Sequence, residues 1–167
     1  MLIEKIDLYE YFHIAREGAE RGTLTCFRHT QVEELRLRRL RPAVLVIPGG
    51  AYAFVSQREA EPVALRYFAQ GFDCFVLDYD ITPHSYPEQL TEAAMAMLYL
   101  RRERDALDLS GRIAAVGFSA GGHLCGCISL LWRDPALVSR FGKECADVRP
   151  GASVMGYPVV TADEQYW

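Results

Sequence analysis

The apolar residues of this chain fall into short runs, separated by glycine, proline and charged residues. Several runs consist of Val, Ile, Leu and Ala with little polar alternation, which is typical of strands covered on both faces in a parallel sheet. We therefore predict strands over residues 23–29, 42–47, 72–79, 112–117 and 152–157.

Between these runs, apolar residues recur at the helical spacing i, i+3, i+4, i+7 and i+8. Pro62 suits a first helical turn, so one helix is predicted to start near Glu61 and to stop at Gly71. A second helix is predicted to open after Pro87, and a third covers residues 120–132. The apolar positions that define the first two are Ala60, Val63, Ala64, Tyr67 and Phe68, then Leu90, Ala93, Ala94, Met97 and Leu98.

Strands that alternate with helices predict one α/β domain over residues 1–167, an open and mostly parallel sheet flanked by helices. The length of 167 residues suits a single domain with a substantial core. In such sheets, ligands sit beyond the carboxyl ends of the strands. Two of those ends draw attention: Ile47 runs into PGGAY, and Val116 runs into GFSAGG.

A serine stands in the second of these segments, in the spacing Gly117-x-Ser119-x-Gly121. A predicted strand precedes it and a predicted helix follows, which is the setting of a nucleophile elbow. Glycines on both sides relieve the crowding of a tight strand–helix turn. Free N–H groups at the helix start would stabilise an anion near Ser119. The alternatives are a glycine-rich turn without a role and a phosphate site, although neither GxxxxGK[ST] nor GxGxxG occurs.

The first segment, PGGAY at residues 48–52, directly follows a predicted buried strand. Its glycines let the backbone approach a ligand and turn N–H groups toward it. Beside Ser119, this loop would supply the other half of an oxyanion hole. A flexible βα loop is the alternative. Three nearby aromatic residues are candidates to line a pocket, with core packing as the other interpretation: Tyr52, Phe54 and Tyr86.

Charge and cysteine content narrow the function classes. The formal net charge is −4, so no basic surface for nucleic acid or anionic membrane is indicated. The N-terminus has no signal-peptide pattern, and no apolar run is long enough for a membrane span. Five cysteines in mostly apolar segments suit buried thiols and a cytoplasmic location. Of His123, Cys125 and Cys127, only the first and third share a helix face, so no metal site is expected.

Four segments carry a family resemblance: RPAVLVIPGGAY, SQREAEPVALRYFAQGFDCFVLDY, GFSAGGHL and GYPVV. From about Gly22 onward, the chain resembles α/β hydrolases, and more narrowly bacterial acetyl-xylan and carbohydrate acetylesterases. The resemblance implies that Ser119 is the nucleophile of an esterase that forms an acyl-enzyme. It places the oxyanion hole at the N–H groups of Gly50, Ala51 and Ala120. It implies no cofactor and a small ester as substrate, with acetylated sugars as candidates. PGG stands where many relatives have HGG.

The resemblance also implies a catalytic histidine that this sequence lacks at the expected place, because the order of the triad in the family is serine, then acid, then histidine. The only histidine after Ser119 is His123, four residues along the same predicted helix, which cannot reach back to the hydroxyl. His84, in the loop after the 72–79 strand, is a candidate substitute base. Asp163, next to Glu164 after the last predicted strand, is a candidate acid.

Three hypotheses follow for this chain. It is a C-terminally incomplete esterase, an enzyme completed by another chain or by His84, or a non-catalytic α/β domain that binds an ester, a sugar or a partner. Within the fold, a lipase-like carboxylesterase and a serine peptidase are further alternatives. The family sheet continues beyond the 152–157 strand, so this strand is predicted to be an exposed edge that promotes self-association.

Overall fold

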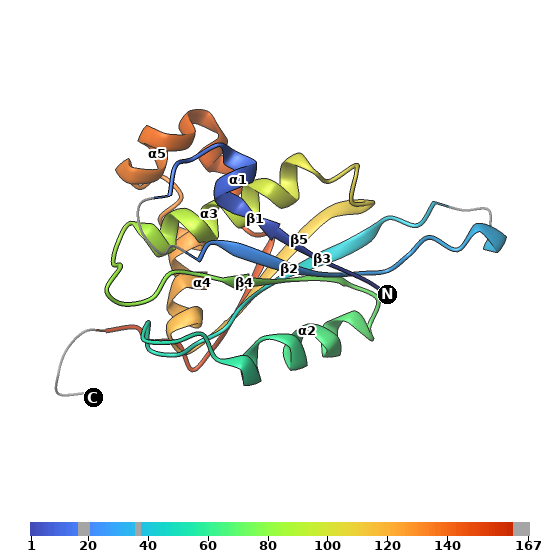
Figure 1. The fold of residues 1–167 in the computed structure, drawn as a ribbon, viewed down its shortest axis with the longest axis horizontal. Coiled ribbons are helices and arrows are strands. Elements are labelled where there is room, and N and C mark those ends of the chain that lie inside the picture. The colour runs from blue at the N-terminus through green and yellow to red at the C-terminus, as the bar shows by residue number, and fades with distance from the viewer. Residues whose placement is uncertain (17–20, 36–37, 162–167) are drawn as a thin grey trace.

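The computed structural model describes residues 1–16, 21–35 and 38–161. These residues form a six-stranded sheet with the strand order β1-β2-β4-β3-β5-β6 (Figure 1). The strands are β1 (Leu2–Asp7), β2 (Thr23–Arg28), β3 (Arg41–Ile47), β4 (Asp73–Asp78), β5 (Leu109–Phe118) and β6 (Ala152–Gly156). All five predicted strands are therefore confirmed, and the predicted limits lie within three residues of the observed ones.

The sheet is mixed, with its parallel part around β3. Strand β3 pairs in parallel with both β4 and β5, and β5 pairs in parallel with β6. Strands β2 and β1 are added antiparallel at the other side. Strand β1 was not predicted, because its sequence LIEKID is rich in charge and its side chains are mostly exposed at the sheet edge. The expected α/β class is confirmed, and the first two strands account for the antiparallel part.

The helices are α1 (Leu8–Phe12), α2 (Glu61–Phe68), α3 (Glu88–Arg102), α4 (Ala120–Leu130) and α5 (Pro135–Phe141), with 3-10 turns η1 (Glu33–Leu35), η2 (Gln57–Glu59) and η3 (Gly142–Val148). The three predicted helices correspond to α2, α3 and α4. Pro62 lies in the first turn of α2, and Gly71 follows its end with φ 93°. Helix α5 was missed, although Asp134 caps it and Pro135 begins it.

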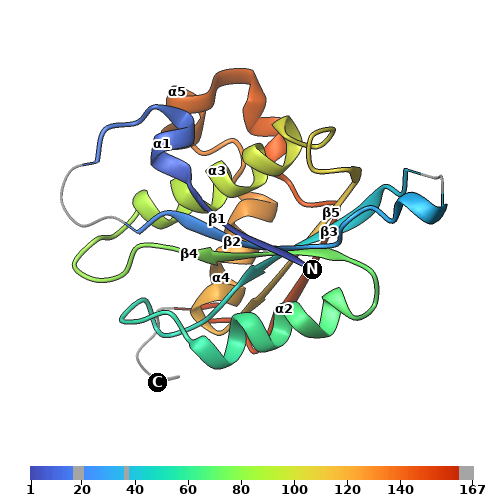
Figure 2. The same ribbon diagram turned by 45° about the vertical axis from the view of Figure 1, so that its right-hand side comes forward.

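Helices cover both faces of the sheet. Figure 2 shows α2 against one face and α1, α3 and α5 on the other. Helix α3 is buried from Gln89 to Leu100, so it forms the centre of the larger core. A smaller core lies beneath α2, where Ala64 packs on Val44 and Val76. In the described part of the chain, no helix combines the length and the apolar character that a membrane crossing requires.

Three strand ends meet at one edge of this sheet. Ile47 at the end of β3 pairs with Gly117 of β5, and Phe118 pairs with Gly156 at the end of β6. Because these strands are parallel neighbours, the segments that follow them emerge side by side. The PGG loop, Ser119 and the segment after β6 are thereby brought together, although they are far apart in the sequence.

Candidate active site

Ser119 occupies the junction between β5 and α4 in a conformation that is rare for a residue with a side chain. Its φ is 53° and its ψ is −120°. Such backbone strain costs about 1–3 kcal/mol and persists only where the surrounding structure enforces it. Strand β5 ends at Phe118 and α4 begins at Ala120, so the chain turns at this one residue. The predicted strand–turn–helix setting of the serine is confirmed.

The two glycines of the GxSxG pattern are required by close backbone contacts. A Cβ atom on Gly117 would lie 2.1 Å from the carbonyl oxygen of Gly121. A Cβ atom on Gly121 would lie 2.1 Å from the carbonyl oxygen of Ile47. Both distances are far inside van der Waals contact, so neither position accepts a side chain without movement of the backbone. The steric reason inferred from the sequence therefore holds for both glycines.

The backbone of Ser119 is also held by hydrogen bonds from two sides. Its N–H donates to the carbonyl oxygen of Gly156 over 3.0 Å. Its carbonyl oxygen accepts from the N–H of His123 at 2.9 Å and of Val159 at 3.2 Å. These bonds fix the orientation of the serine relative to α4 and to the segment after β6.

The PGG loop turns sharply at Gly50, Ala51 and Tyr52, which all have positive φ values. At Gly50, φ is 131° and an added Cβ would lie 1.9 Å from the carbonyl oxygen of Phe54, so glycine is needed there. Among the described residues, nothing accepts a hydrogen bond from the N–H groups of Gly50, Ala51 or Ala120. Ala120 opens α4, where the first N–H groups are unpaired and the helix dipole is positive.

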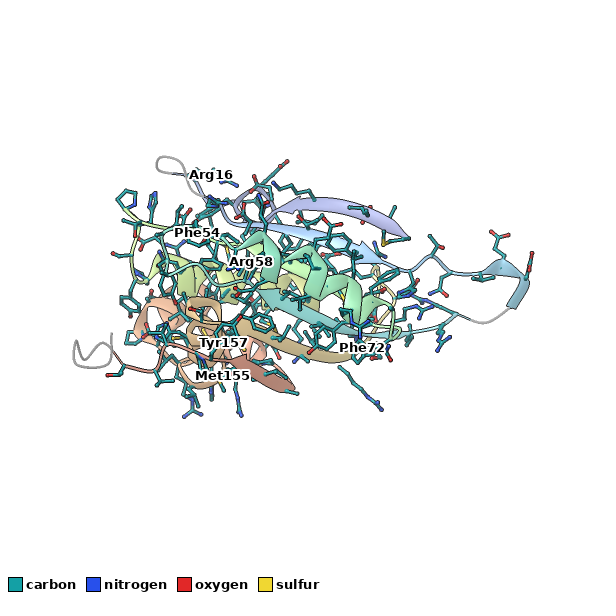
Figure 3. All side chains as sticks on the ribbon, turned by 90° about the horizontal axis from the view of Figure 1, so that it is seen from below. Arg16, Phe54, Arg58, Phe72, Met155 and Tyr157 are labelled. Atoms are coloured by element: carbon teal, nitrogen blue, oxygen red, sulfur yellow. The ribbon has the colours of Figure 1, made fainter. Side chains whose placement is uncertain are left out.

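Ser119 and the loop face a common open cavity of about 360 Å³. Figure 3 shows Phe54, Arg58 and Tyr157 in the left half of the molecule and Phe72, which precedes β4, further to the right. The cavity therefore lies beyond the carboxyl ends of the strands, as the fold class predicts. Its lining residues are Gly50, Ala51, Phe54, Ser56, Arg58, Glu59, Ser119 and Tyr157.

Glu59 lines this cavity and was not predicted from the sequence. One carboxylate oxygen accepts from the N–H of Gly49 at 2.8 Å. The other accepts from the hydroxyl of Tyr157 at 2.7 Å. This hydrogen bond to Glu59 raises the pKa of Tyr157. No spacing rule connects Glu59 to residues 10 and 98 positions away, so only the fold reveals the contact.

A second cavity, of about 320 Å³, lies between the loop after β4 and helix α4. In it, the hydroxyl of Tyr52 is 2.7 Å from Nδ1 of His123, and Sγ of Cys127 is 3.5 Å from Nε2 of the same ring. The contact between His123 and Cys127 agrees with their predicted common helix face. Burial raises the pKa values of Tyr52 and Cys127. Both nitrogens of His123 are thus engaged away from Ser119.

His84, the candidate substitute base, lines this second cavity and not that of Ser119. Its Nδ1 lies 3.8 Å from a carboxylate oxygen of Asp80. Asp163 and Glu164 lie outside the described residues. The structure therefore brings together Ser119, Gly50, Ala51 and Ala120, and it leaves His84 in a separate cavity.

Two of the three aromatic candidates are exposed, and the third, Tyr52, is half-buried and packs against the larger core. Phe54 is 56% exposed and lines the Ser119 cavity. Tyr86 is 62% exposed and lines the second cavity together with the half-buried Tyr52. Both interpretations therefore hold in part: all three rings line a cavity, that of Ser119 only for Phe54, and Tyr52 also packs on the core.

The sheet order, the strained serine and the glycine-rich loop define an α/β hydrolase fold. The α/β hydrolase enzyme MGS-M1, from a Medee basin deep-sea metagenome library, matches with a TM-score of 0.79 and 38% identity, over 100% of this chain and 61% of that chain. The acetyl ester-xyloside bifunctional hydrolase of Caldicellulosiruptor lactoaceticus matches with a TM-score of 0.70 and 30% identity, over 85% of this chain and 50% of that chain.

More narrowly, residues 35–153 match the BD-FAE family model, and the chain belongs to the BD-FAE family. Endo-1,4-beta-xylanase B of Butyrivibrio fibrisolvens is 34% identical over 130 residues, which are 72% of this chain and 20% of that protein. This chain thus spans one fifth of the length of that relative and half to three fifths of the two structural neighbours.

Proposed function

We propose that this chain carries the nucleophile and the oxyanion hole of a serine esterase that cleaves short acyl esters, acetyl esters of carbohydrates among them. The observation that carries the proposal is the strained Ser119, which faces one cavity with the Gly50–Ala51 backbone. The names of the two carbohydrate-active relatives support the substrate class. The name of one of them, an acetyl ester-xyloside bifunctional hydrolase, supports acetyl esters as substrates.

In the proposed reaction, the Ser119 hydroxyl oxygen attacks the ester carbonyl carbon while its proton passes to a general base. The N–H groups of Gly50, Ala51 and Ala120 stabilise the negative charge that develops on the carbonyl oxygen. The alcohol leaves with a proton, an acyl-enzyme forms on Ser119, and water releases the acid. No step of this sequence requires a metal or an organic cofactor.

The proposed reaction needs a general base that takes the proton of the Ser119 hydroxyl. Among residues 1–16, 21–35 and 38–161, no histidine lines the Ser119 cavity. We therefore expect slow turnover by the 167-residue chain alone, since proteases stripped of triad members retain about 10³–10⁴-fold catalysis over water. A base from another polypeptide, or His84 after a rearrangement of its loop, would raise that rate. Asp163 remains the candidate acid.

The same observation favours a second candidate, a ligand-binding domain without turnover. The test is hydrolysis of p-nitrophenyl acetate by the intact chain and by Ser119→Ala, with Ser139→Ala on the exposed side of α5 as the matched control. Turnover that disappears only in Ser119→Ala supports the esterase. Equal rates in all three proteins contradict it, and calorimetric binding of acetylated xylobiose then tests the second candidate. His84→Ala abolishes turnover only if His84 is the base.

We also propose that the β6 edge promotes self-association of this chain. In the described residues, β6 pairs with β5 on one side only. Val154 and Met155 on this strand are 52% and 47% exposed. Unpaired backbone groups next to apolar side chains form a template for another strand edge.

A further inference from the structure

One short turn holds Gly49 on both sides. The N–H of Gly49 donates to the Glu59 carboxylate, and the carbonyl oxygen of Gly49 accepts from the N–H of Ser56 at 2.9 Å. Ser56 and Glu59 are themselves joined, because the N–H of Glu59 donates to the carbonyl oxygen of Ser56 at 3.2 Å. Gly49 is buried, and Glu59 is the acceptor that the structure gives its N–H. The turn around η2 therefore fixes the peptide planes on both sides of Gly49.

Those planes set the direction of the Gly50 N–H. In a trans peptide the C=O and the following N–H point to opposite sides. Because the carbonyl of Gly49 points toward Ser56, the N–H of Gly50 points away from it. If the Glu59 carboxylate is removed, the plane before Gly49 keeps only the hydrogen bond that the Tyr79 hydroxyl donates to the carbonyl oxygen of Pro48 at 2.6 Å. With the N–H side of that plane free, the Gly50 N–H can tilt.

The second carboxylate oxygen of Glu59 connects the loop to the end of β6, which is hydrogen-bonded to the backbone of Ser119. It accepts from Tyr157, and the carbonyl of the preceding residue, Gly156, accepts from the N–H of Ser119. A Cβ atom on Gly49 would lie 2.7 Å from the Glu59 carboxylate and 3.0 Å from Cβ of Ser119. The Glu59 carboxylate and the Ser119 side chain are therefore both close to Gly49, and they leave no room for a side chain at that position.

We propose that Glu59 is a positioning residue: its carboxylate orients the PGG loop toward the carbonyl oxygen of the ester whose carbon Ser119 attacks, and ties that loop through Tyr157 to the end of β6. This inference rests on the proposed esterase function. Glu59 acts through the backbone of Gly49 and Gly50, and both of its oxygens are already occupied as acceptors.

The first test is kinetic and uses the intact chain. Glu59→Ala removes both hydrogen bonds and is expected to lower kcat for p-nitrophenyl acetate about 10- to 100-fold at a nearly constant KM, because misplaced oxyanion donors act on the transition state. Glu59→Gln keeps an acceptor for Gly49 and a polar group for Tyr157, so it should retain kcat within about threefold. Tyr157→Phe breaks one bond and should fall between them. Glu61→Gln, in the first turn of α2, is the matched control.

The second test does not need turnover. Amide hydrogen exchange, read by NMR, is expected to accelerate at least about tenfold at the Gly49 N–H in Glu59→Ala, while the amides of β3 keep the exchange of the parent protein. If the chain has no Ser119-dependent activity, the proposed function fails and this measurement alone decides the role of Glu59.

Three outcomes overturn the inference. In the first, Glu59→Ala keeps both kcat and Gly49 exchange. In the second, Glu59→Gln loses as much activity as Glu59→Ala, which would make the charge the cause. In the third, all amides of the sheet exchange faster together, which would indicate general destabilisation. If Glu59→Ala does not fold, Tyr157→Phe with unchanged kcat has the same meaning.

Discussion

The backbone of Gly121, in the first turn of α4, lies directly against the carbonyl oxygen of Ile47 at the end of β3. A Cβ atom on Gly121 would approach that oxygen to 2.1 Å and the next carbonyl, of Pro48, to 2.3 Å. Both obstacles are backbone atoms, which cannot turn away as a flexible side chain can. Helix α4 therefore reaches the PGG loop only because residue 121 has no side chain.

Gly121→Ala is accordingly expected to lower the free energy of unfolding by about 2–4 kcal/mol, because the added methyl group forces α4 away from β3. Gly126→Ala, five residues further along α4, is the matched control. Its new Cβ would meet the flexible Met155 side chain at 3.3 Å, and alanine favours helix, so its stability should stay within about 1 kcal/mol of the parent. Urea unfolding of the three proteins measures both values, and equal stability of the two variants would contradict the close contact.

Glu92, on α3, predicts a pH dependence of stability. It is fully buried, and burial raises the pKa of its carboxyl group to about 8, with the charge of Asp80 as a further cause. The folded state thus holds this proton more tightly than the unfolded state, whose pKa is near 4.5. The stability that this group contributes is complete below the unfolded pKa and is lost as the pH rises through the folded one.

Glu92→Gln removes that titration. From pH 5 to pH 8 the parent is expected to lose about 1–3 kcal/mol of unfolding free energy more than Glu92→Gln does, because only the parent has to ionise a buried carboxyl group. Chemical denaturation at the two pH values gives the difference. A difference that is the same at both would show that Glu92 titrates alike in the folded and unfolded states.

Asp73 predicts a stability effect far from the candidate active site. One of its oxygens accepts from the backbone N–H of His29 at 2.8 Å and lies 2.9 Å from Nδ1 of that ring, which stacks on Phe68. Asp73 is buried, so Asp73→Ala is expected to cost about 2–4 kcal/mol because the backbone N–H and the ring of His29 lose this hydrogen-bond partner. Asp105→Ala, whose carboxylate is 85% exposed, should cost less than about 0.5 kcal/mol. Thermal unfolding of the two variants compares their stabilities. An Asp105→Ala variant less stable than Asp73→Ala would contradict the stabilising role of Asp73.

The β6 edge predicts concentration-dependent association. Val154→Lys places a charge on the exposed strand and is expected to shift the protein toward the monomer in sedimentation experiments. Val138→Lys, at a valine of similar exposure on α5, should leave the association unchanged. A parent protein that sediments as a monomer at every concentration would contradict the proposed role of this edge.

Much of this fold could be predicted because its central strands contain short apolar runs. The apolar runs of β3 and β4, and residues 115–117 of β5, are buried on both faces, and burial of that kind is visible in the sequence. Strand β1 could not be predicted in this way, since its charged side chains face solvent at the sheet edge. It forms because its backbone pairs with β2, and no apolar pattern in its own sequence indicates this pairing.

In the candidate site, too, some residues could be predicted from the sequence and others could not. Ser119 and its glycines form a local motif, so their strained turn could be predicted from a few neighbouring residues. Glu59 reaches the site through contacts with Gly49 and Tyr157, which depend on how distant segments fold together. The position of His84 depends on the path of the loop after β4, which carries it into the second cavity. Composition and spacing contain no information on either arrangement.

The bond between Tyr157 and Glu59 spans 98 residues. During synthesis at about 5–20 residues per second, Glu59 therefore leaves the peptidyl-transferase centre roughly 5–20 seconds before its phenolic partner exists. Throughout that interval the PGG loop lacks its tie to the end of β6, and Ser119, once made, lacks its acceptor until Gly156 has been added. A nascent chain that has not yet reached residue 157 already contains the complete GxSxG motif but lacks the assembled site. The presence of the motif in such a fragment therefore does not show that the fragment can catalyse the reaction.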